Sequence, residues 1–249
     1  MIDLETIKLL SQKYQTRIDN IIREYFQHLF LSLLYSQKES EDIYFKGGTA
    51  LKIIYHSPRF SEDLDFSASK NISLSQIDDL FLETLKKMNE VGAKVNLEEA
   101  KRTSGGYFGI FSYELHGFLG KIQLEISLRK KSNLQQEVTT IVSDFLPAYI
   151  LIQLSPRLIV EEKMLALEMR HKPRDFYDLY FILRHPELNK HLDFKKIKTI
   201  KEILLKEKIN FKKELEILLP VSHHLLLNNF KETLLKEIEK QEVERSLKN

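Results

Sequence analysis

The chain has 249 residues and no cysteine, 43% of its residues are hydrophobic, and its formal net charge is +2. This composition excludes disulfides and thiolate-ligated zinc, argues against a chain that is mainly disordered, and does not by itself mark a nucleic-acid-binding protein. The longest apolar run, FQHLFLSLLY, is too short and too polar for a membrane span, and the acidic N-terminus MIDLETIKLL is unlike a signal peptide. We therefore expect a cytoplasmic protein of one or two domains with no membrane partner.

Residues 1–40 are expected to form an N-terminal helical segment. Apolar side chains recur every three or four residues from residue 3 to about 34, which is typical of an amphipathic helix. We interpret this helix as a packing element and not as part of a catalytic site. The stripe consists of Ile7, Leu10, Tyr14, Ile18, Ile21, Tyr25 and Leu29.

Residues 41–150 are predicted to form a core of the α/β or α+β class. Short β-rich runs such as IYF, LDF, KVNL, FGIFSYEL and KIQLEISLR alternate with one helical stretch from about Ser73 to Val91. The polar stretch KKSNLQQEVTT, residues 130–140, is expected to be a flexible loop that joins this core to the helices that follow.

Residues 151–249 are predicted to form a C-terminal helical region. After Pro156, leucine, lysine and glutamate recur at helical spacing, with breaks at Pro173, Pro186 and Pro220. Eight lysines between residues 195 and 213 could neutralise an RNA backbone. The glutamates between them favour a solvated helix face instead.

Two adjacent glycines precede the first short helix of the core. A strand that ends at Lys46 is followed by a helix expected from Thr49 to Tyr55, which places Gly47 and Gly48 at the turn between them. Free backbone N–H groups and the positive end of a helix dipole favour an anion at such a turn, and a backbone without Cβ atoms lets a phosphate approach closely. The alternative is a plain tight turn in which Thr49 is the helix N-cap.

Two aspartates stand one residue apart in the next predicted strand. Asp63 and Asp65 point to one face, because side chains at i and i+2 of a strand share a face. Leu64 and Phe66 then face the core. Two carboxylates this close repel each other unless a cation lies between them, and Mg²⁺ takes one or two carboxylates together with substrate phosphates. The alternatives are a solvated pair, or an ion pair of one aspartate with Arg59.

A third acid, Glu125, lies at the centre of a later strand whose residues alternate between apolar and polar. If this strand lies beside Asp63 and Asp65, three carboxylates could hold two metal ions, one that activates an attacking hydroxyl and one that stabilises the leaving phosphate. Taken alone, Glu125 is an exposed strand residue.

A lysine and two aspartates stand on predicted helices in the stretch EEKMLALEMRHKPRDFYDLYFIL. Pro173 suits a first helical turn, so Asp175 can be an acid that stabilises the positive end of a helix. Arg174 and Asp178 can form a simple i, i+4 pair, and Lys163 can be a solvated helix lysine. The residues alone do not distinguish these interpretations from a functional site.

The two sequence blocks together resemble a known family. FKGGTALKIIY and RFSEDLDFS, followed by EEKMLALEMRHKPRDFYDLYFIL, are similar to the AbiEii/AbiGii group of bacterial nucleotidyltransferase toxins, which is related to the MenT toxins and to the superfamily of DNA polymerase β. Both blocks occur in the family's order, and the resemblance covers residues 41 to 185. It implies an α+β fold, with a small mixed-sheet nucleotidyltransferase core between the N-terminal helix and the C-terminal helical region.

The resemblance also implies roles for the residues of the first block. Gly48 and Thr49 would hold the triphosphate of an NTP, and Gly47 would permit the turn. Asp63 and Asp65 would bind Mg²⁺, with Mn²⁺ as the alternative metal.

In the second block, Lys163 would contact a nucleotide phosphate, and the family's Arg-Asp pair falls on Arg174 and Asp175. Asp175 is therefore predicted to be catalytic, with Asp178 a further acid one turn on. The superfamily's third metal-binding acid is usually aspartate, and the candidate here is Glu125.

We therefore predict a Mg²⁺-dependent nucleotidyltransferase that moves NMP from an NTP to an acceptor hydroxyl and releases pyrophosphate. By resemblance, the acceptor would be RNA, such as the 3′ end of tRNA, and the protein would be the toxin of a bacterial toxin–antitoxin or abortive-infection pair with a cognate antitoxin. The alternatives are a nucleotide-binding regulatory module without turnover, a nucleotidyltransferase that modifies a protein, and a metal-dependent nuclease.

Overall fold

The computed structural model describes residues 1–128 and 134–247, and the chain divides into two compact units. The first unit comprises Met1–His56 and Phe60–Ser155, and the second comprises Ser57–Arg59 and Pro156–Asn249. The three-residue segment Ser57–Arg59 thus belongs to the second unit although the residues on both sides of it belong to the first. No described helix is long and apolar enough to cross a membrane.

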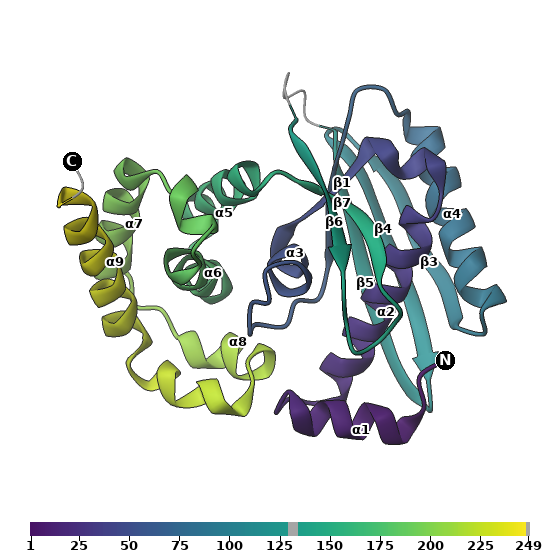
Figure 1. Cartoon of the computed structure of the whole chain (residues 1–249), viewed down its shortest axis with the longest axis horizontal. Helices are drawn as coiled ribbons and strands as arrows, with labels where there is room; N and C mark the ends of the chain where they lie inside the picture. Colours follow the sequence, from purple (N-terminus) through teal and green to yellow (C-terminus); the bar gives the residue numbers. More distant parts are fainter. Residues whose placement is uncertain (129–133, 248–249) are drawn as a thin grey trace. The chain divides into compact units, whose positions relative to one another are not determined.

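The first unit is built on a seven-stranded mixed sheet with the order β3-β4-β5-β2-β1-β7-β6 (Figure 1). The pairs β2–β5 and β1–β7 are parallel, and the other neighbouring pairs are antiparallel. The α+β class and the mixed sheet expected from the sequence are thereby confirmed. The strands are β1 (Ile43–Lys46), β2 (Leu64–Ala68), β3 (Lys94–Thr103), β4 (Gly106–Leu115), β5 (Phe118–Ser127), β6 (Gln136–Ile141) and β7 (Tyr149–Leu154).

The helices of the first unit differ from the prediction at the N-terminus. One helix was expected from residue 3 to about 34, but the structure has two, α1 and α2. The helices of the first unit are α1 (Leu4–Lys13), α2 (Ile18–Tyr35), η1 (Lys38–Asp42), α3 (Gly47–Ile53) and α4 (Leu74–Glu90). The chain turns at Gln15, which has a φ of 51° and so leaves the right-handed helical region. The apolar stripe does not reveal this break, because its residues in both helices pack in or against the same hydrophobic core.

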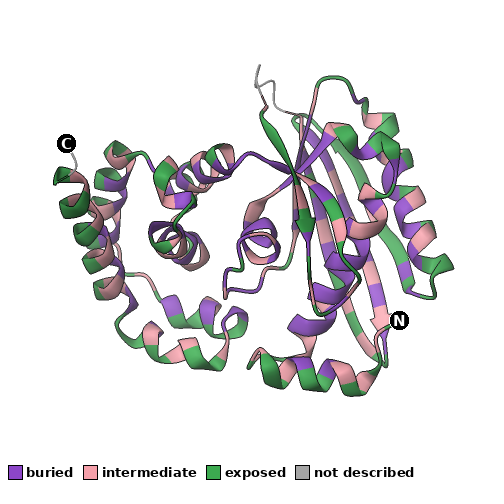
Figure 2. Ribbon diagram, in the orientation of Figure 1, coloured by how far each residue is buried: buried purple, intermediate pink, exposed green. Residues whose placement is uncertain are grey.

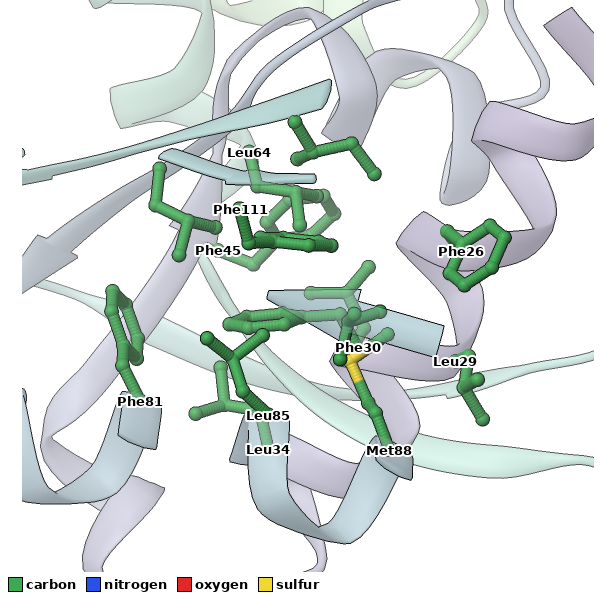
Figure 3. Close-up of a cluster of buried hydrophobic side chains, with 14 of the residues drawn as sticks. Phe26, Leu29, Phe30, Leu34, Phe45, Leu64, Phe81, Leu85, Met88 and Phe111 are labelled. Carbon is green, nitrogen blue, oxygen red and sulfur yellow. The ribbon is translucent and has the colours of Figure 1, made fainter. Parts of the chain in front are cut away.

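The core of the first unit lies between the sheet and the helices α2 and α4, which Figure 1 shows on one side of the sheet. The ring of Phe30 in α2 stacks on that of Phe111 in β4, with centroids 5.5 Å apart, and meets Phe81 of α4 edge-on at the same distance (Figure 3). Figure 2 shows how densely buried residues follow one another along α2. Burial of each such ring contributes about 1.5–3 kcal/mol, which fixes the sheet against these helices.

The predicted loop at residues 130–140 is wrong from Gln136 onward. Residues 130–133 lie outside the described part of the chain, but β6 begins at Gln136 and pairs antiparallel with β7. The β-branched residues of the stretch VTTI, which runs from Val138 to Ile141, suit this edge strand. The chain therefore returns to the sheet for two more strands before the helical region begins.

The second unit is helical, as predicted, and no described residue after Leu154 is in a strand. Pro173 is the first residue of a helix, as expected from its fixed φ. Three aromatic rings pack together in this unit: the ring centroid of Phe211 lies 4.9 Å from that of Phe230 and 5.9 Å from that of Phe176. The elements are α5 (Pro156–Arg170), α6 (Pro173–Arg184), η2 (Leu188–His191), α7 (Phe194–Lys206), α8 (Phe211–Leu218), η3 (Val221–Asn229) and α9 (Phe230–Ser246).

Candidate active site

The glycine turn lies directly against the second aspartate of the Asp-x-Asp pair. Gly47 has a φ of +86°, a backbone conformation that residues other than glycine adopt only with strain. A Cβ at this position would lie 2.7 Å from both Cβ and Cγ of Asp65 and closer still to Oδ2. Only a glycine fits here, because the Asp65 side chain occupies the place that a Cβ would take. The turn and the acidic strand, 18 residues apart in sequence, therefore form one site.

The helix after the turn begins earlier than predicted. α3 starts at Gly47 itself and ends at Ile53, and its N-cap is Lys46. The alternative in which Thr49 caps the helix is therefore wrong. Thr49 is fully buried, and its hydroxyl donates a hydrogen bond to the backbone carbonyl of Asp63. This bond ties α3 to the segment that carries the aspartates, so a phosphate contact of Thr49 would use its backbone N–H.

The two aspartates stand at the start of β2. Asp63 immediately precedes the strand and Asp65 is its second residue. Leu64 and Phe66 are both fully buried, which confirms the predicted alternation. Asp65 pairs in register with Lys46 on one side and with Glu125 on the other. The carboxylate of Asp65 thus belongs to a row of charged residues that crosses three adjacent strands.

Glu125 lies on the strand next to Asp65, as the sequence analysis required, but its carboxylate is engaged elsewhere. The side chain of Glu125 is exposed and accepts a hydrogen bond of 2.5 Å from Nε2 of Gln123. Among residues 1–128 and 134–247, no three His, Asp or Glu side chains are arranged as ligands of one metal ion. The residues fit the simpler arrangement, in which Asp63 and Asp65 hold Mg²⁺ and substrate phosphates complete its shell.

In the second unit, Asp178 is the centre of a buried ion network. Arg59 donates to it twice, from Nε to Oδ1 at 2.8 Å and from Nη2 to Oδ2 at 3.0 Å. Lys163 Nζ donates to Oδ2 at 2.7 Å. Burial alone would raise the pKa of Asp178, but the charges of Arg59 and Lys163 outweigh it, so the pKa lies below its ordinary value and the group stays ionised.

This network overturns two of the simpler interpretations. The side chain of Lys163 is only 13% exposed, so Lys163 is not a solvated helix lysine. Asp178 does not depend on Arg174 for its charge partner, because Arg174 Nε lies 3.4 Å from Glu214 instead. Arg59 Nε forms an ion pair with Oδ1 of Asp178.

Asp175 is buried at the N-terminal turn of α6 and is more than a surface acid at a helix start. Arg170 Nη2 donates to its Oδ1 at 2.8 Å. Its Oδ2 is buried and has no hydrogen-bond partner in the described part of the protein. A buried carboxylate oxygen without a partner is unfavourable unless a donor or a cation reaches it, so the Oδ2 of Asp175 can accept one further polar contact.

The lysines between residues 195 and 213 are partly paired within the chain. Lys196 Nζ lies 3.4 Å from Glu168, and Lys201 Nζ lies 3.2 Å from Glu242 and 3.3 Å from Glu239. These pairs support the interpretation of a solvated helix face and reduce the positive charge available to RNA.

The predicted site residues fall into two sets. Gly47, Gly48, Thr49, Asp63, Asp65 and Glu125 lie in the first unit, and Lys163 and Asp175 lie in the second. Sequence reasoning missed the role of Arg59 as the partner of Asp178. No local pattern could have revealed this pair, because 119 residues separate its members.

Comparisons with known proteins identify the family of the chain. A family model described as "Nucleotidyl transferase AbiEii toxin, Type IV TA system" matches residues 30–249. A search of curated proteins finds no match.

Several solved structures share the fold. JHP933 from Helicobacter pylori has a TM-score of 0.55 and 22% identity, and the match covers 94% of this chain and 100% of that one. A putative nucleotidyltransferase from H. pylori has a TM-score of 0.54 and 22% identity over 89% of this chain and 97% of that one. The nucleotidyltransferase toxin MenT4 from Mycobacterium tuberculosis H37Rv has a TM-score of 0.62 and 17% identity over 94% of this chain and 89% of that one.

At these identities the structural matches establish the fold, whereas the family model spans most of the chain. The chain is a nucleotidyltransferase and belongs to the AbiEii family of toxins.

Proposed function

We propose that this nucleotidyltransferase uses Mg²⁺ to transfer NMP from an NTP to a hydroxyl of RNA, with the 3′ end of tRNA as the preferred acceptor. It would act as the toxin of a pair whose antitoxin restrains it. The observation that carries the proposal is the contact of the Gly47 turn with the Asp65 carboxylate, because it combines a close approach to backbone N–H groups with a metal-binding acid.

The candidate site residues of the first unit would bind the triphosphate and its metal ion. The backbone at Gly47, Gly48 and Thr49 would donate N–H groups to phosphate oxygens. Asp63 and Asp65 would hold Mg²⁺, or Mn²⁺, whose chemistry when bound is to neutralise phosphate charge and to favour ionisation of the attacking hydroxyl. The Thr49 hydroxyl fixes the backbone of Asp63, so the two aspartates keep their place while the substrate binds.

The candidate site residues of the second unit, Lys163 and Asp175, would make polar contacts with the substrates. Lys163 would contact a phosphate of the NTP, because its ammonium is held by Asp178 and still has two N–H donors to offer. The buried Oδ2 of Asp175 would accept one polar contact from the substrate or the acceptor. Catalysis would then consist of positioning and electrostatic stabilisation without a covalent enzyme intermediate.

The reaction balances without any further reactant. The acceptor oxygen bonds to the α-phosphorus of the NTP, the bond from that phosphorus to the pyrophosphate oxygen breaks, and the hydroxyl proton is released. The products are the nucleotidylated acceptor and pyrophosphate.

A label-transfer assay tests the proposal. Purified protein, Mg²⁺ and total tRNA are incubated with each α-³²P-labelled NTP in turn, with and without EDTA. We expect label in tRNA from at least one NTP and none with EDTA. Label in protein instead of tRNA would indicate a protein acceptor, and an NTP that binds without any transfer would indicate a regulatory module.

Shortening of unlabelled tRNA would indicate a nuclease. Co-expression with the neighbouring open reading frames, scored by growth, identifies the antitoxin. Growth arrest that no neighbour relieves would contradict the toxin–antitoxin pairing.

A further inference from the structure

Strand β4 carries an aromatic ring on the face of the sheet opposite to α2 and α4 (Figure 1). Tyr107 and Phe111 of this strand are buried and pack on rings of those helices, whereas Phe108 and Ile110 alternate with them and are partly exposed on the other face. In the described part of the chain, Phe108 belongs neither to the buried core of the first unit nor to the partly buried side chains packed against it. The ring of Phe108 is therefore not needed to hold the sheet against its helices.

The ring of Phe108 can be reached from solvent, because an exposed side chain lies over it. Lys101 stands opposite Phe108 on β3, and its Nζ lies 4.6 Å from the centroid of the ring. The side chain of Lys101 is 56% exposed and its Nζ also pairs with Glu99 at 2.7 Å, so the lysine can move aside at little cost. A nucleobase can then stack on the face of the ring.

Phe108 lies in the same row of the sheet as Asp65. Asp65 of β2 pairs in register with Glu125 of β5, and Glu125 pairs with Phe108 of β4. Residues that pair in this way point to one face, so Asp65 and Phe108 lie on the same face, two strands and about 10 Å apart. A nucleotide that reacts at Asp65 is long enough to place its base on the ring of Phe108.

The two sides of Asp65 in the sheet suit the two substrates. On one side is β1, which leads into the Gly47 turn where the triphosphate would bind, and on the other side are β5 and β4. In an in-line displacement, the attacking hydroxyl approaches the α-phosphorus from the side opposite to the leaving pyrophosphate. Pyrophosphate held at the Gly47 turn thus requires that the acceptor come from the side of β5 and β4, where Phe108 lies.

We infer that Phe108 is the stacking platform for the base of the 3′-terminal nucleoside of the acceptor RNA. The inference rests on the proposed function, in which RNA supplies the attacking hydroxyl. A terminal nucleoside suits this row, because its free hydroxyls can donate hydrogen bonds to the neighbouring acids, whereas an internal nucleotide would bring a second phosphate that those acids repel. A phenyl ring stacks on every base, so this contact positions the terminal nucleoside without reading its identity.

Label transfer tests the inference when the KM for tRNA and the KM for NTP are measured separately. We expect Phe108→Ala to raise the KM for tRNA about tenfold, which is the usual loss for one base stack, and to leave the KM for NTP unchanged. Phe108→Tyr keeps the ring and should keep the wild-type KM.

Leu119→Ala is the matched control, because Leu119 is an apolar residue of β5 that is 81% exposed. Leu119 and Glu125 stand an even number of residues apart on β5, so they share a face, but about 20 Å of strand separates them. The Leu119 variant should transfer label to tRNA as the wild type does.

A second acceptor separates stacking from a structural effect. A tRNA whose 3′-terminal residue keeps its hydroxyls but lacks its base should have an about tenfold higher KM with the wild type. Phe108→Ala should cause no further loss with this acceptor, because the same contact is already missing. A structural role of the ring predicts an equal loss with both acceptors. Urea unfolding of the variants shows whether they are folded, and Phe108→Ala should be, since the ring lies outside the core.

Three results would overturn the inference, and they differ in what they leave standing. If folded Phe108→Ala has the wild-type KM for tRNA, or loses equally with both acceptors, the ring is structural and the nucleotidyltransferase proposal survives. If the KM for NTP rises instead of that for tRNA, the ring stacks on the base of the NTP and the acceptor enters elsewhere. If the wild type transfers no label to tRNA, the proposed function fails and the RNA subsite fails with it.

Discussion

Asp65 of the first unit and Asp178 of the second are held in opposite ways. Asp65 is half-buried, and its carboxylate packs so closely against Gly47 that no Cβ would fit there. Asp178 is almost completely buried and is clamped by two cations of the chain itself. A half-buried acid beside a backbone turn can be reached by a metal ion, whereas a fully buried acid between two cations of the chain is held in one place. The two units therefore hold these acidic residues in different environments.

The largest expected effect comes from removing the charge at Asp65. Asp65→Asn keeps the size of the side chain but removes the negative charge that a metal ion requires. We expect label transfer to fall by at least about 10²-fold with little change in the melting temperature. Asp79→Asn, an exposed aspartate of α4, is the control and should be fully active. Activity of Asp65→Asn within a few-fold of the wild type would remove the distinction between the two acids.

The second-largest effect is expected from a substitution of Gly47. Gly47→Ala forces a side chain into a left-handed backbone conformation and against Asp65, so it should lower the free energy of unfolding by about 1–3 kcal/mol and nearly abolish transfer. Gly92→Ala is a matched control, because Gly92 has a similar φ of +90° but its nearest neighbour, an atom of Met1, would be 3.8 Å from the new Cβ.

The Gly92 variant should lose stability by a similar backbone strain and keep its activity. Equal losses of activity in the two variants, measured beside urea unfolding, would mean that backbone strain alone explains the effect of Gly47→Ala.

A third prediction uses Glu24, a buried acid of the first unit without the two close cations of Asp178. Burial raises the pKa of Glu24 from 4.5 to about 7, and Lys52, whose Nζ lies 4.0 Å away, only partly opposes this. The folded state thus binds the proton more tightly than the unfolded state. Stability should fall as the pH rises from 4.5 to 7 and remain low above pH 7, by about 3 kcal/mol in total.

Glu24→Gln should remove this loss and raise the melting temperature at pH 8. The exposed Glu90→Gln provides the control and should leave the pH profile unchanged. If the free energy of unfolding of the wild type does not change between pH 5 and pH 8, the ionised form of Glu24 is stabilised by its surroundings, as that of Asp178 is, and the prediction is wrong.

The smallest expected effect is at Glu125. This acid stands beside Asp65 in the sheet, but its exposed carboxylate bonds to Gln123, so Glu125→Gln should reduce transfer by about tenfold or less. The rate is measured with Mg²⁺ and again with Mn²⁺. A loss as large as that of Asp65→Asn would make Glu125 a full partner of the aspartates and would restore the three-carboxylate arrangement.

The candidate site residues of the first unit could be picked out from sequence because the patterns that mark them are local. The alternation of Leu64 and Phe66 fixed the face on which Asp63 and Asp65 lie, and a strand-to-helix turn needs only neighbouring residues. The contact of Gly47 with Asp65 was not predictable, since it depends on the antiparallel pairing of β1 with β2.

The features that were not predicted depend mainly on contacts between residues far apart in sequence. Arg59 and Asp178 lie 119 positions apart in sequence and are brought together only by the tertiary fold, so neither residue carries a local signal of the other. The edge strand β6 was missed because its polar residues favour a loop, and only its pairing with β7 overrides that preference. The break between α1 and α2 was hidden because both helices bury the same stripe.

The measurement that tests the central claim most directly is the release of labelled pyrophosphate from γ-³²P-labelled NTPs by the wild type and by Asp63→Asn, with tRNA and Mg²⁺ present. Our account predicts release that depends on tRNA and matches the NMP incorporated, and none above background with Asp63→Asn. Release of equal size from the Asp63→Asn variant would contradict the assignment of the Gly47 turn and the two aspartates as the nucleotide site.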